Sequence, residues 1–422
     1  MSAQLSLEQK KRLSNRNILL FVSGKFISLF GSSIYSFAIG LYILKLTGSG
    51  TSFAVALVCA SVPRIIFGPI VGTLADRFDR KKIIILSEVL SGLLMLFMIG
   101  YSVLFGLPLL LLYISEVLIS IFSTFFSVTA SSSIPSMAGD KSIQKAGSLN
   151  QSASSLAGIL GPIIAGILYG FLSIQMIILI NACSFIVAAV IEAFILFDLY
   201  ANHEKTVEKQ EFFQSMKEGF LYLKDNGFLY SLIKASFWIN FFFAGINVAL
   251  PYLLVTELKF SSSSYGLVSA IVSVGALLTS LILSTRKEIR DKMKAIRLGL
   301  YGLAILTTAI GIPPMLEISH MTFNVSYYLV VLGAIGAIIM IVNIPIQVLI
   351  QRTTPSHYLG RIFGLVETIA SAISPIGMVL FGIMLDHLPS FYIPILAGTA
   401  LLFIAIFGMR GISAPTETKL AG

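Results

Sequence analysis

Apolar residues in this chain occur in long uninterrupted runs, and polar residues gather in short clusters between the runs. Most runs reach about 20 residues, the length that an α-helix needs to cross the ~30 Å hydrocarbon core of a bilayer. They lack the ten-residue alternation of polar and apolar positions that is typical of transmembrane β-strands. The pattern therefore predicts an all-α membrane protein with twelve spanning helices. The expected helices are 17–44, 52–74, 83–105, 108–130, 147–169, 173–197, 228–255, 264–284, 295–316, 326–350, 362–385 and 390–410.

The composition agrees with a membrane location and explains the net charge of +9. Hydrophobic residues make up 56% of the chain and charged residues 12%, against roughly 25% charged residues in soluble domains. Of the 29 Lys and Arg residues, only Lys45 and Lys259 fall in the loops expected outside. Such a bias follows the positive-inside rule. We therefore expect a multi-pass protein of the plasma membrane, with both termini cytoplasmic and with no nucleic-acid partner.

The longest polar interruption, 198–227, separates six expected helices from six others. Apolar residues recur within it at helical spacing, which predicts an amphipathic linker helix on the inner membrane surface. The halves repeat at an offset of about 211 residues. We therefore expect an N-terminal six-helix bundle over 1–197, the linker, and a C-terminal six-helix bundle over 228–422. Two bundles of this kind are typical of secondary transporters, which hold substrate near the membrane midplane.

The segment 72–82, GTLADRFDRKK, carries the most informative motif. Gly72, Asp76, Arg77, Arg80 and Lys81 follow one another in an order that resembles the signature G-x-x-x-D-R-x-G-R-[RK] of the major facilitator superfamily. The resemblance implies that the small residue at position 72 lets one helix approach another. It also implies a twelve-helix fold of two pseudo-symmetric bundles that works by alternating access.

The resemblance also implies a cytoplasmic gate. Asp76 would meet the N-terminal end of the 362–385 helix and pair with Arg80, and Glu367 would lie near them. Asp79 departs from the usual glycine, and D-R-x-D-R-K-K is similar to the macrolide-efflux and enterobactin-exporter branch, often named drug:proton antiporter family 3. The alternative is that the charges of the loop, Lys81 above all, only fix its orientation, and that Glu367 lies at a solvated helix end.

The 147–169 segment contains GPIIAG, which resembles the end of the antiporter motif G-P-x-x-G-G through Gly161, Pro162 and Gly166. Ser148 and Ala157 stand where the motif usually has further glycines. Small residues still permit close helix packing. Simple packing without any bearing on transport direction is the alternative.

Ionisable residues within the expected helices are candidates for function because charge is costly inside a bilayer. Arg64 lies about 15 Å above the inner edge of its helix and Glu116 about 12 Å below the outer edge of its own, so the two are predicted to pair. Lys25 and Glu192 either meet or extend to water. A buried pair could be structural, whereas a carboxylate in such a place could also carry protons.

Aromatic and amide side chains are candidates for the substrate cavity, since they suit a bulky amphiphilic compound. Packing against lipid or against neighbouring helices is the alternative for all of them. The candidates are Trp238, Asn240, Phe241 and Asn247 in 228–255, Asn150 and Gln151 in 147–169, and Asn343 and Gln347 in 326–350.

Motifs of enzymes are missing from the sequence. It has neither the phosphate-binding pattern G-x-x-x-x-G-K-[ST] nor the metalloprotease pattern H-E-x-x-H. We therefore expect a monomeric transporter, not an enzyme, without cofactor or metal site. Its expected partners are protons, membrane lipid and a small-molecule substrate that is hydrophobic or amphiphilic and leaves the cell. The alternatives are an exporter of a siderophore or lipid-like anion, an uncoupled facilitator, and an integral-membrane lipid enzyme.

Overall fold

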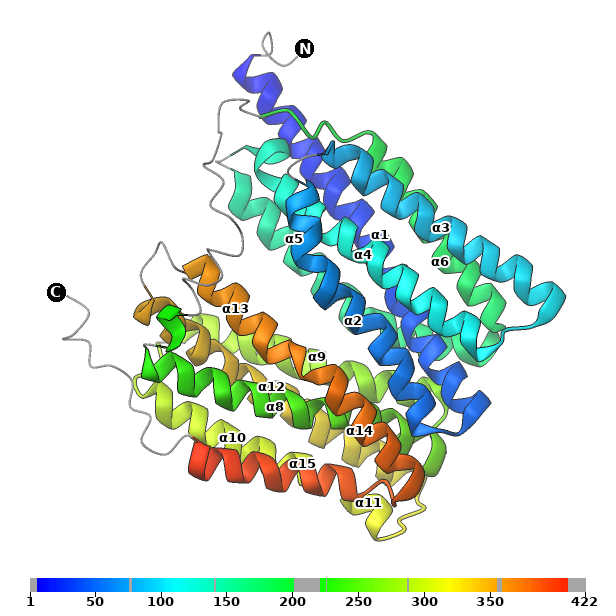
Figure 1. The fold of residues 1–422 in the computed structure, drawn as a ribbon, viewed down its shortest axis with the longest axis vertical. Coiled ribbons are helices and arrows are strands. Elements are labelled where there is room, and N and C mark those ends of the chain that lie inside the picture. The colour runs from blue at the N-terminus through cyan, green and yellow to red at the C-terminus, as the bar shows by residue number, and fades with distance from the viewer. Residues whose placement is uncertain are drawn as a thin grey trace. The chain divides into compact units, whose positions relative to one another are not determined.

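The computed structural model describes residues 6–75, 78–139, 142–200, 221–224, 226–286, 288–354 and 359–408. Within these ranges every regular element is helical (Figure 1). Eleven of the described helices are long and apolar enough to cross a membrane, and Tyr392–Gly408 forms a shorter apolar helix at the position of the twelfth expected span. The all-α membrane fold predicted from the sequence is therefore confirmed.

The first half of the chain contains six helices, and the second half contains the remaining ones. The first six are α1 (Leu7–Thr47), α2 (Gly50–Ala75), α3 (Arg80–Phe105), α4 (Leu109–Ala138), α5 (Ile143–Phe171) and α6 (Ile174–Ala193). The later elements are α8 (Gly227–Pro251), the π-helical η3 (Tyr252–Glu257), α9 (Ser262–Thr285), α10 (Lys292–Ala309), α11 (Ile312–Met315), α12 (Met321–Thr353), α13 (Leu359–Ala372), α14 (Ser374–His387), α15 (Tyr392–Phe403) and the π-helical η4 (Ile404–Gly408).

The contacts divide the chain into two compact units. The N-terminal unit consists of Met1–Leu46, Val55–Lys205 and Ser261–Gly266, and the C-terminal unit of Thr47–Ala54, Thr206–Phe260 and Leu267–Gly422. The main division falls inside the interval that the sequence predicts as a linker. Most of the predicted amphipathic linker helix lies outside the described residues, so the linker stays a prediction.

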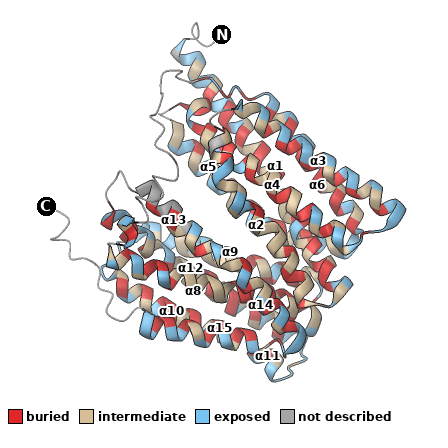
Figure 2. Ribbon diagram, in the orientation of Figure 1, coloured by how far each residue is buried: buried red, intermediate tan, exposed pale blue. Residues whose placement is uncertain are grey.

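In the N-terminal unit, α3 packs along both α6 and α4. Gly92 of α3 makes this approach close, because a Cβ there would lie 3.1 Å from the side chain of Ile186 in α6. Met95 and Met98 of α3 are fully buried in the same core as Phe185 of α6. Buried residues, red in Figure 2, follow the helix faces that meet neighbouring helices.

In the C-terminal unit, α10 packs against α12 and α15, and α8 packs against α14. Asp386, near the end of α14, accepts hydrogen bonds at the first turn of α2. Its carboxylate receives the Gly50 N–H at 2.6 Å, the Thr51 N–H at 3.2 Å and the Ser49 hydroxyl at 2.9 Å. These contacts satisfy donors that a helix start otherwise leaves unpaired.

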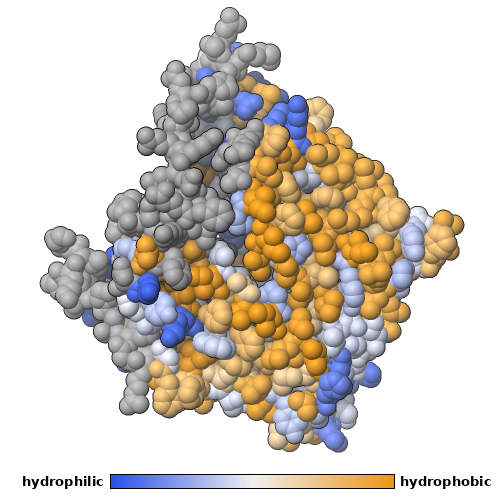
Figure 3. Space-filling model, in the orientation of Figure 1, coloured by the Kyte–Doolittle hydropathy of each residue, from blue (hydrophilic) through white to orange (hydrophobic). Residues whose placement is uncertain are grey.

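Large apolar side chains remain exposed on the outer helix faces, for example Leu93, Phe97 and Val103 of α3. Apolar residues, orange in Figure 3, cover much of the described surface on the face shown. A soluble monomer rarely exposes so large an apolar area. These faces fit contact with lipid.

Candidate functional site

The N-terminal unit contains a polar cavity of about 330 Å³ to which α1 through α6 all contribute. Hydroxyl groups dominate its polar lining, and the phenyl rings of Phe122, Phe126 and Phe185 supply part of the apolar lining. The lining serines are Ser28, Ser32, Ser36, Ser87, Ser91, Ser120, Ser123, Ser127 and Ser154. Such a lining offers both hydrogen bonds and apolar contact to a ligand.

Helical periodicity explains how these side chains converge. On α1 the lining residues follow one face from Lys25 to Ser36, and on α4 they follow one face from Glu116 to Ser127. In both helices they recur at intervals of three and four residues, which return to the same face after each turn. The remaining faces of the two helices are largely apolar and pack in the core.

Four charged residues line this cavity: Lys25, Arg64, Glu88 and Glu116. Lys25, Glu88 and Glu116 are buried, whereas Arg64 is exposed. The predicted partners Arg64 and Glu116 thus face the same cavity. Within the described part of the chain, Arg64 and Glu116 form no ion pair closer than 4.0 Å. Their pairing in some transport state stays a prediction.

Glu88 is the site residue that the sequence interpretation missed. The Ser28 hydroxyl donates a hydrogen bond of 2.8 Å to its Oε1 atom, while its buried Oε2 atom has no hydrogen-bond partner. The signal was available, because Glu88 is an acidic residue inside an expected helix. It lies about 12 Å from the start of α3.

Lys25 and Glu192 lie in the same neighbourhood, and both are buried, at 6% and 0% exposure. Glu192 approaches α1 next to Lys25, because a Cβ at Gly24 would lie 3.2 Å from its Oε1 atom. It interacts electrostatically with Lys25 and with Glu88. Both of its carboxylate oxygens lack hydrogen-bond partners. Neither Lys25 nor Glu192 extends to the surface of the unit.

The loop before α3 shows why Asp79 replaces the glycine of the family signature. Its carboxylate accepts the backbone N–H groups of Lys81 at 2.9 Å and Lys82 at 3.3 Å, which makes it the N-cap of α3. Aspartate is among the best residues at this position. Arg80 donates to the Ser132 carbonyl of α4 at 3.1 Å. This departure from the signature thus has a local structural role.

Lys81 connects the start of α3 to the end of α6. Its Nζ atom donates to the carbonyl oxygens of Ala193 at 2.5 Å and Ile195 at 3.2 Å. Terminal carbonyls of a helix carry partial negative charge and are stabilised by a cation. Lys81 therefore has a specific packing role besides any effect on topology.

The predicted gate itself stays a prediction. Asp76 and Arg77 lie outside the described residues, as does the side chain of Glu367. Apart from its chain neighbours and the backbone of its own helix, no described residue has an atom within 4 Å of the position that a Cβ at Gly72 would take. The close helix approach expected at this glycine is therefore not seen among them.

The glycines of the α5 motif lie at close contacts within the N-terminal unit. A Cβ at Gly161 would collide with the Ser33 side chain of α1. A Cβ at Gly166 would lie 2.5 Å from the Ser262 carbonyl oxygen and 3.1 Å from the Gly266 Cα. Both positions thus require the absence of a side chain. Pro162, between them, continues the helix. The bearing of the motif on transport direction is a prediction.

The eight aromatic and amide candidates do not line the cavity of the N-terminal unit. Phe241 packs against Phe381 of α14, with 5.5 Å between ring centroids, and Trp238 is exposed. A role of these residues in binding stays a prediction. The eight are Trp238, Asn240, Phe241, Asn247, Asn150, Gln151, Asn343 and Gln347.

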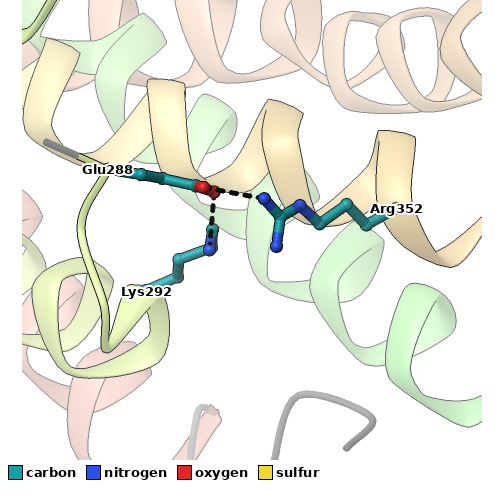
Figure 4. A network of polar contacts seen from close by, with 3 residues as sticks. All are labelled: Glu288, Lys292 and Arg352. Carbon is teal, nitrogen blue, oxygen red and sulfur yellow. Dashed lines mark hydrogen bonds and ion pairs between the residues drawn. The ribbon is translucent and has the colours of Figure 1, made fainter. Parts of the chain in front are cut away.

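A charged network lies in the C-terminal unit between α9, α10 and α12 (Figure 4). Glu288 forms ion pairs with Lys292 at 2.8 Å and Arg352 at 2.7 Å. The hydrogen bond from Lys292 and the charges of both bases hold the pKa of Glu288 below its ordinary value. Glu288 and Lys292 also line a cavity of about 230 Å³. Because the carboxylate is exposed, we regard the network as a surface link.

Comparisons with known proteins agree with the fold and with the motif. The chain is 24% identical over 387 residues to macrolide efflux protein A of Streptococcus pyogenes, which covers 91% of this chain and 93% of that protein. It is 26% identical over 402 residues to the uncharacterized MFS-type transporter YfiS of Bacillus subtilis (strain 168), over 94% of each. The crystal structure of a bacterial homologue of the iron transporter ferroportin is similar in fold, with a TM-score of 0.70, 16% identity, and coverage of 96% of this chain and 100% of that one. A family model described as Major Facilitator Superfamily matches residues 21–378. The chain is thus a transporter and not an enzyme, as the sequence predicted, and it belongs to the major facilitator superfamily.

Proposed function

We propose that this transporter exports hydrophobic or amphiphilic small molecules from the cell in exchange for protons. It acts as a monomer in the plasma membrane, with both termini in the cytoplasm. The observation that carries the proposal is the cavity of the N-terminal unit, where Glu88 and Glu116 are buried beside serine hydroxyls and phenyl rings. A buried carboxylate is costly when ionised, so it readily takes a proton or meets a positive ligand.

Export as the direction is supported by the similarity to macrolide efflux protein A over nearly the whole chain. The motif of segment 72–82, with its resemblance to the drug:proton antiporter branch, points the same way. An amphiphile suits the cavity because one end can reach hydroxyl and charged groups while an apolar part contacts Phe122, Phe126 and Phe185.

A second candidate is a dedicated exporter of a siderophore or lipid-like anion. Lys25 and Arg64 both line the cavity, which favours an anionic ligand. Glu88 and Glu116 line it as well and offset the two positive charges. The balance of charge therefore leaves the amphiphile as the leading substrate class.

Everted membrane vesicles provide the test. Three kinds of vesicle are compared: those with the parent chain, those with Glu116→Gln and those without the transporter. Each is energised so that its interior is acidic. A macrolide, a lipophilic cation or a catecholate siderophore is then added outside. We expect the parent to accumulate the first two compounds and to release protons on their addition, and Glu116→Gln to do so weakly. Accumulation without proton movement would establish an uncoupled facilitator. Accumulation of the siderophore alone would establish the second candidate.

The orientation is tested separately. Tags added at residues 1 and 422 should react with an impermeant reagent only after the cells are opened, because the distribution of basic residues predicts that both ends lie inside. Labelling of either tag in intact cells would contradict the proposed topology.

A further inference from the structure

Three buried ionisable side chains lie near one another between α1, α3 and α6 of the N-terminal unit. Glu192 is 0% exposed, Glu88 2% and Lys25 6%. The carboxylate of Glu192 interacts electrostatically with both of the others. Within the described part of the chain, only one of the four carboxylate oxygens accepts a hydrogen bond, namely the one that receives the Ser28 hydroxyl.

The charges of this cluster do not balance. Two carboxylates face one ammonium group, so full ionisation leaves one net negative charge in a place almost without water. Three buried oxygens without hydrogen-bond partners make that state still less favourable. One added positive charge would neutralise the cluster.

A proton supplies that charge better than a metal ion does. Hard metal cations take six or more oxygen ligands, whereas the cluster offers two carboxylates and one hydroxyl, and the Lys25 ammonium repels a metal cation. A proton needs only one carboxylate oxygen and converts an acceptor into a donor. One of the two groups is then a carboxylic acid while the other stays ionised, with the Lys25 ammonium as the nearby positive charge.

The cavity gives this proton a route. Lys25 and Glu88 line it, whereas Glu192 does not. Water in the cavity can therefore deliver a proton to Glu88, and Glu192 lies behind it as the second acceptor. Release follows the reverse path, from the carboxylic acid of Glu88 back to cavity water.

The same balance of charges holds for the whole cavity when the titratable groups around the cluster are included. Tyr35 and Cys59 interact with Glu116, and both are neutral when they carry their protons. The charged groups are Lys25 on α1, Arg64 on α2, Glu88 on α3, Glu116 on α4 and Glu192 on α6. Two bases thus oppose three carboxylates, and one positive charge makes the cavity with its cluster neutral.

We infer that Glu88 and Glu192, held with Lys25 between α1, α3 and α6, bind the proton that this transporter exchanges, and that a substrate with a single positive charge displaces it. The inference rests on the proposed proton-coupled export and specifies its acid groups and its substrate class. Proton and organic cation compete because either one neutralises the same excess negative charge. The cation itself lies in the cavity, near Glu88 and Glu116.

Proton release on binding is the direct test. The purified full chain in detergent, in weakly buffered solution with a pH indicator, is mixed with tetraphenylphosphonium, a permanent monovalent cation. We expect release of about one proton per bound cation, and a Kd that falls about tenfold per pH unit as the pH rises through the range where the proton is displaced.

The variants separate the cluster from other titrating groups. Glu88→Gln and Glu192→Gln each leave two bases against two carboxylates, so proton release should be lost and binding should become weaker and independent of pH. Lys25→Gln leaves one base against three carboxylates, so the cluster should hold its proton more tightly, and the pH range in which the cation displaces the proton should move to higher pH. Glu317→Gln, which changes an exposed carboxylate of the C-terminal unit, serves as the matched control and should behave as the parent. Gel filtration and thermal unfolding establish that each variant is folded. If one glutamine variant does not fold, the other one and Lys25→Gln test the inference.

Unchanged proton release in the folded glutamine variants would overturn the inference. Three results with the parent chain would overturn it as well. The chain does not bind tetraphenylphosphonium, it binds the cation without releasing a proton, or its binding depends on the sodium concentration and not on pH. The vesicle assay distinguishes these failures from failure of the proposed function. A parent chain that exports a macrolide with proton exchange retains the proposed function even when the inference about the cluster is wrong.

Discussion

Lys81 and Lys82 are adjacent bases at the start of α3, and the structure assigns them different roles. The Lys81 ammonium donates to the carbonyls of Ala193 and Ile195 at the end of α6, at 2.5 and 3.2 Å. Lys82 is exposed, and its described contact is the backbone bond to the Asp79 cap. Replacing either lysine by glutamine removes one base from the same loop, so any effect on topology is matched. Any difference in stability between the two variants therefore measures the contact of Lys81 with the end of α6.

The contacts set the size of the expected difference. A cation at a helix C-terminus contributes about 0.3 to 1 kcal/mol, and a buried hydrogen bond to a charged group about 1.5 to 3 kcal/mol. Lys81 is partly exposed, so water replaces some of this. We expect Lys81→Gln to lower the free energy of unfolding of the N-terminal unit by about 1 to 2 kcal/mol. Lys82→Gln should change it by less than about 0.5 kcal/mol.

Thermal unfolding of the purified variants in detergent measures the difference. For a unit of this size, the expected loss corresponds to an apparent Tm lower by roughly 2 to 8 °C in Lys81→Gln. Both variants should reach the membrane in equal amounts with unchanged orientation. Equal Tm values for the two variants would refute the assigned role of Lys81, and inverted topology in either would show that the bases act chiefly on insertion.

Four further predictions concern other contacts. The pKa of Glu288 is lowered in the folded chain, so its contribution to stability is present at neutral pH and is lost as the pH falls through that lowered pKa. Between pH 7 and about pH 3, the Tm of Glu288→Gln should therefore fall less than that of the parent. Gly166→Ala should lower the Tm because its Cβ meets backbone at 2.5 Å, whereas Gly158→Ala, with no described atom within 4 Å, should not. Asp386→Ala should cost about 1 kcal/mol in unfolding measurements, because it leaves donors at the start of α2 without their acceptor. Asp76→Asn should reduce efflux normalised to membrane protein without reducing expression, as the family signature implies; unchanged efflux would remove its role as a gate.

The sequence predicts the helices well because their length and apolar character are fixed by the bilayer. Their ends are less predictable. The first helix begins at Leu7, ten residues before the expected start, because a polar helix extends the apolar one. Ser6 and Gln9 exchange hydrogen bonds there as a capping box. That pattern is visible in the sequence, but a hydropathy criterion ignores it.

The end of α6 could not be predicted from the sequence, for a different reason. Apolar residues continue to Phe197, yet the helix ends at Ala193. The Asn17 side chain of α1 accepts the Leu196 N–H at 3.2 Å and donates to the Leu196 carbonyl at 2.9 Å. These bonds replace helical ones with a contact between residues 179 positions apart. Local sequence carries no sign of such a contact, so the boundary depends on the packed structure.

In the candidate site, too, the sequence predicts which residues are unusual, but the packed structure determines which of them are neighbours. Charge is rare inside apolar helices, and this sequence property alone singles out Lys25, Arg64, Glu116 and Glu192 as candidates. Which of them meet depends on helix rotation, since one residue turns a helix by about 100°. Depth alone pairs Arg64 with Glu116, whereas the packed helices bring Glu192 together with Lys25 and with Glu88. Charge balance among neighbours therefore becomes an argument only once the neighbours are known, and here it shows that the cavity and the cluster beside it carry one carboxylate more than their bases can neutralise.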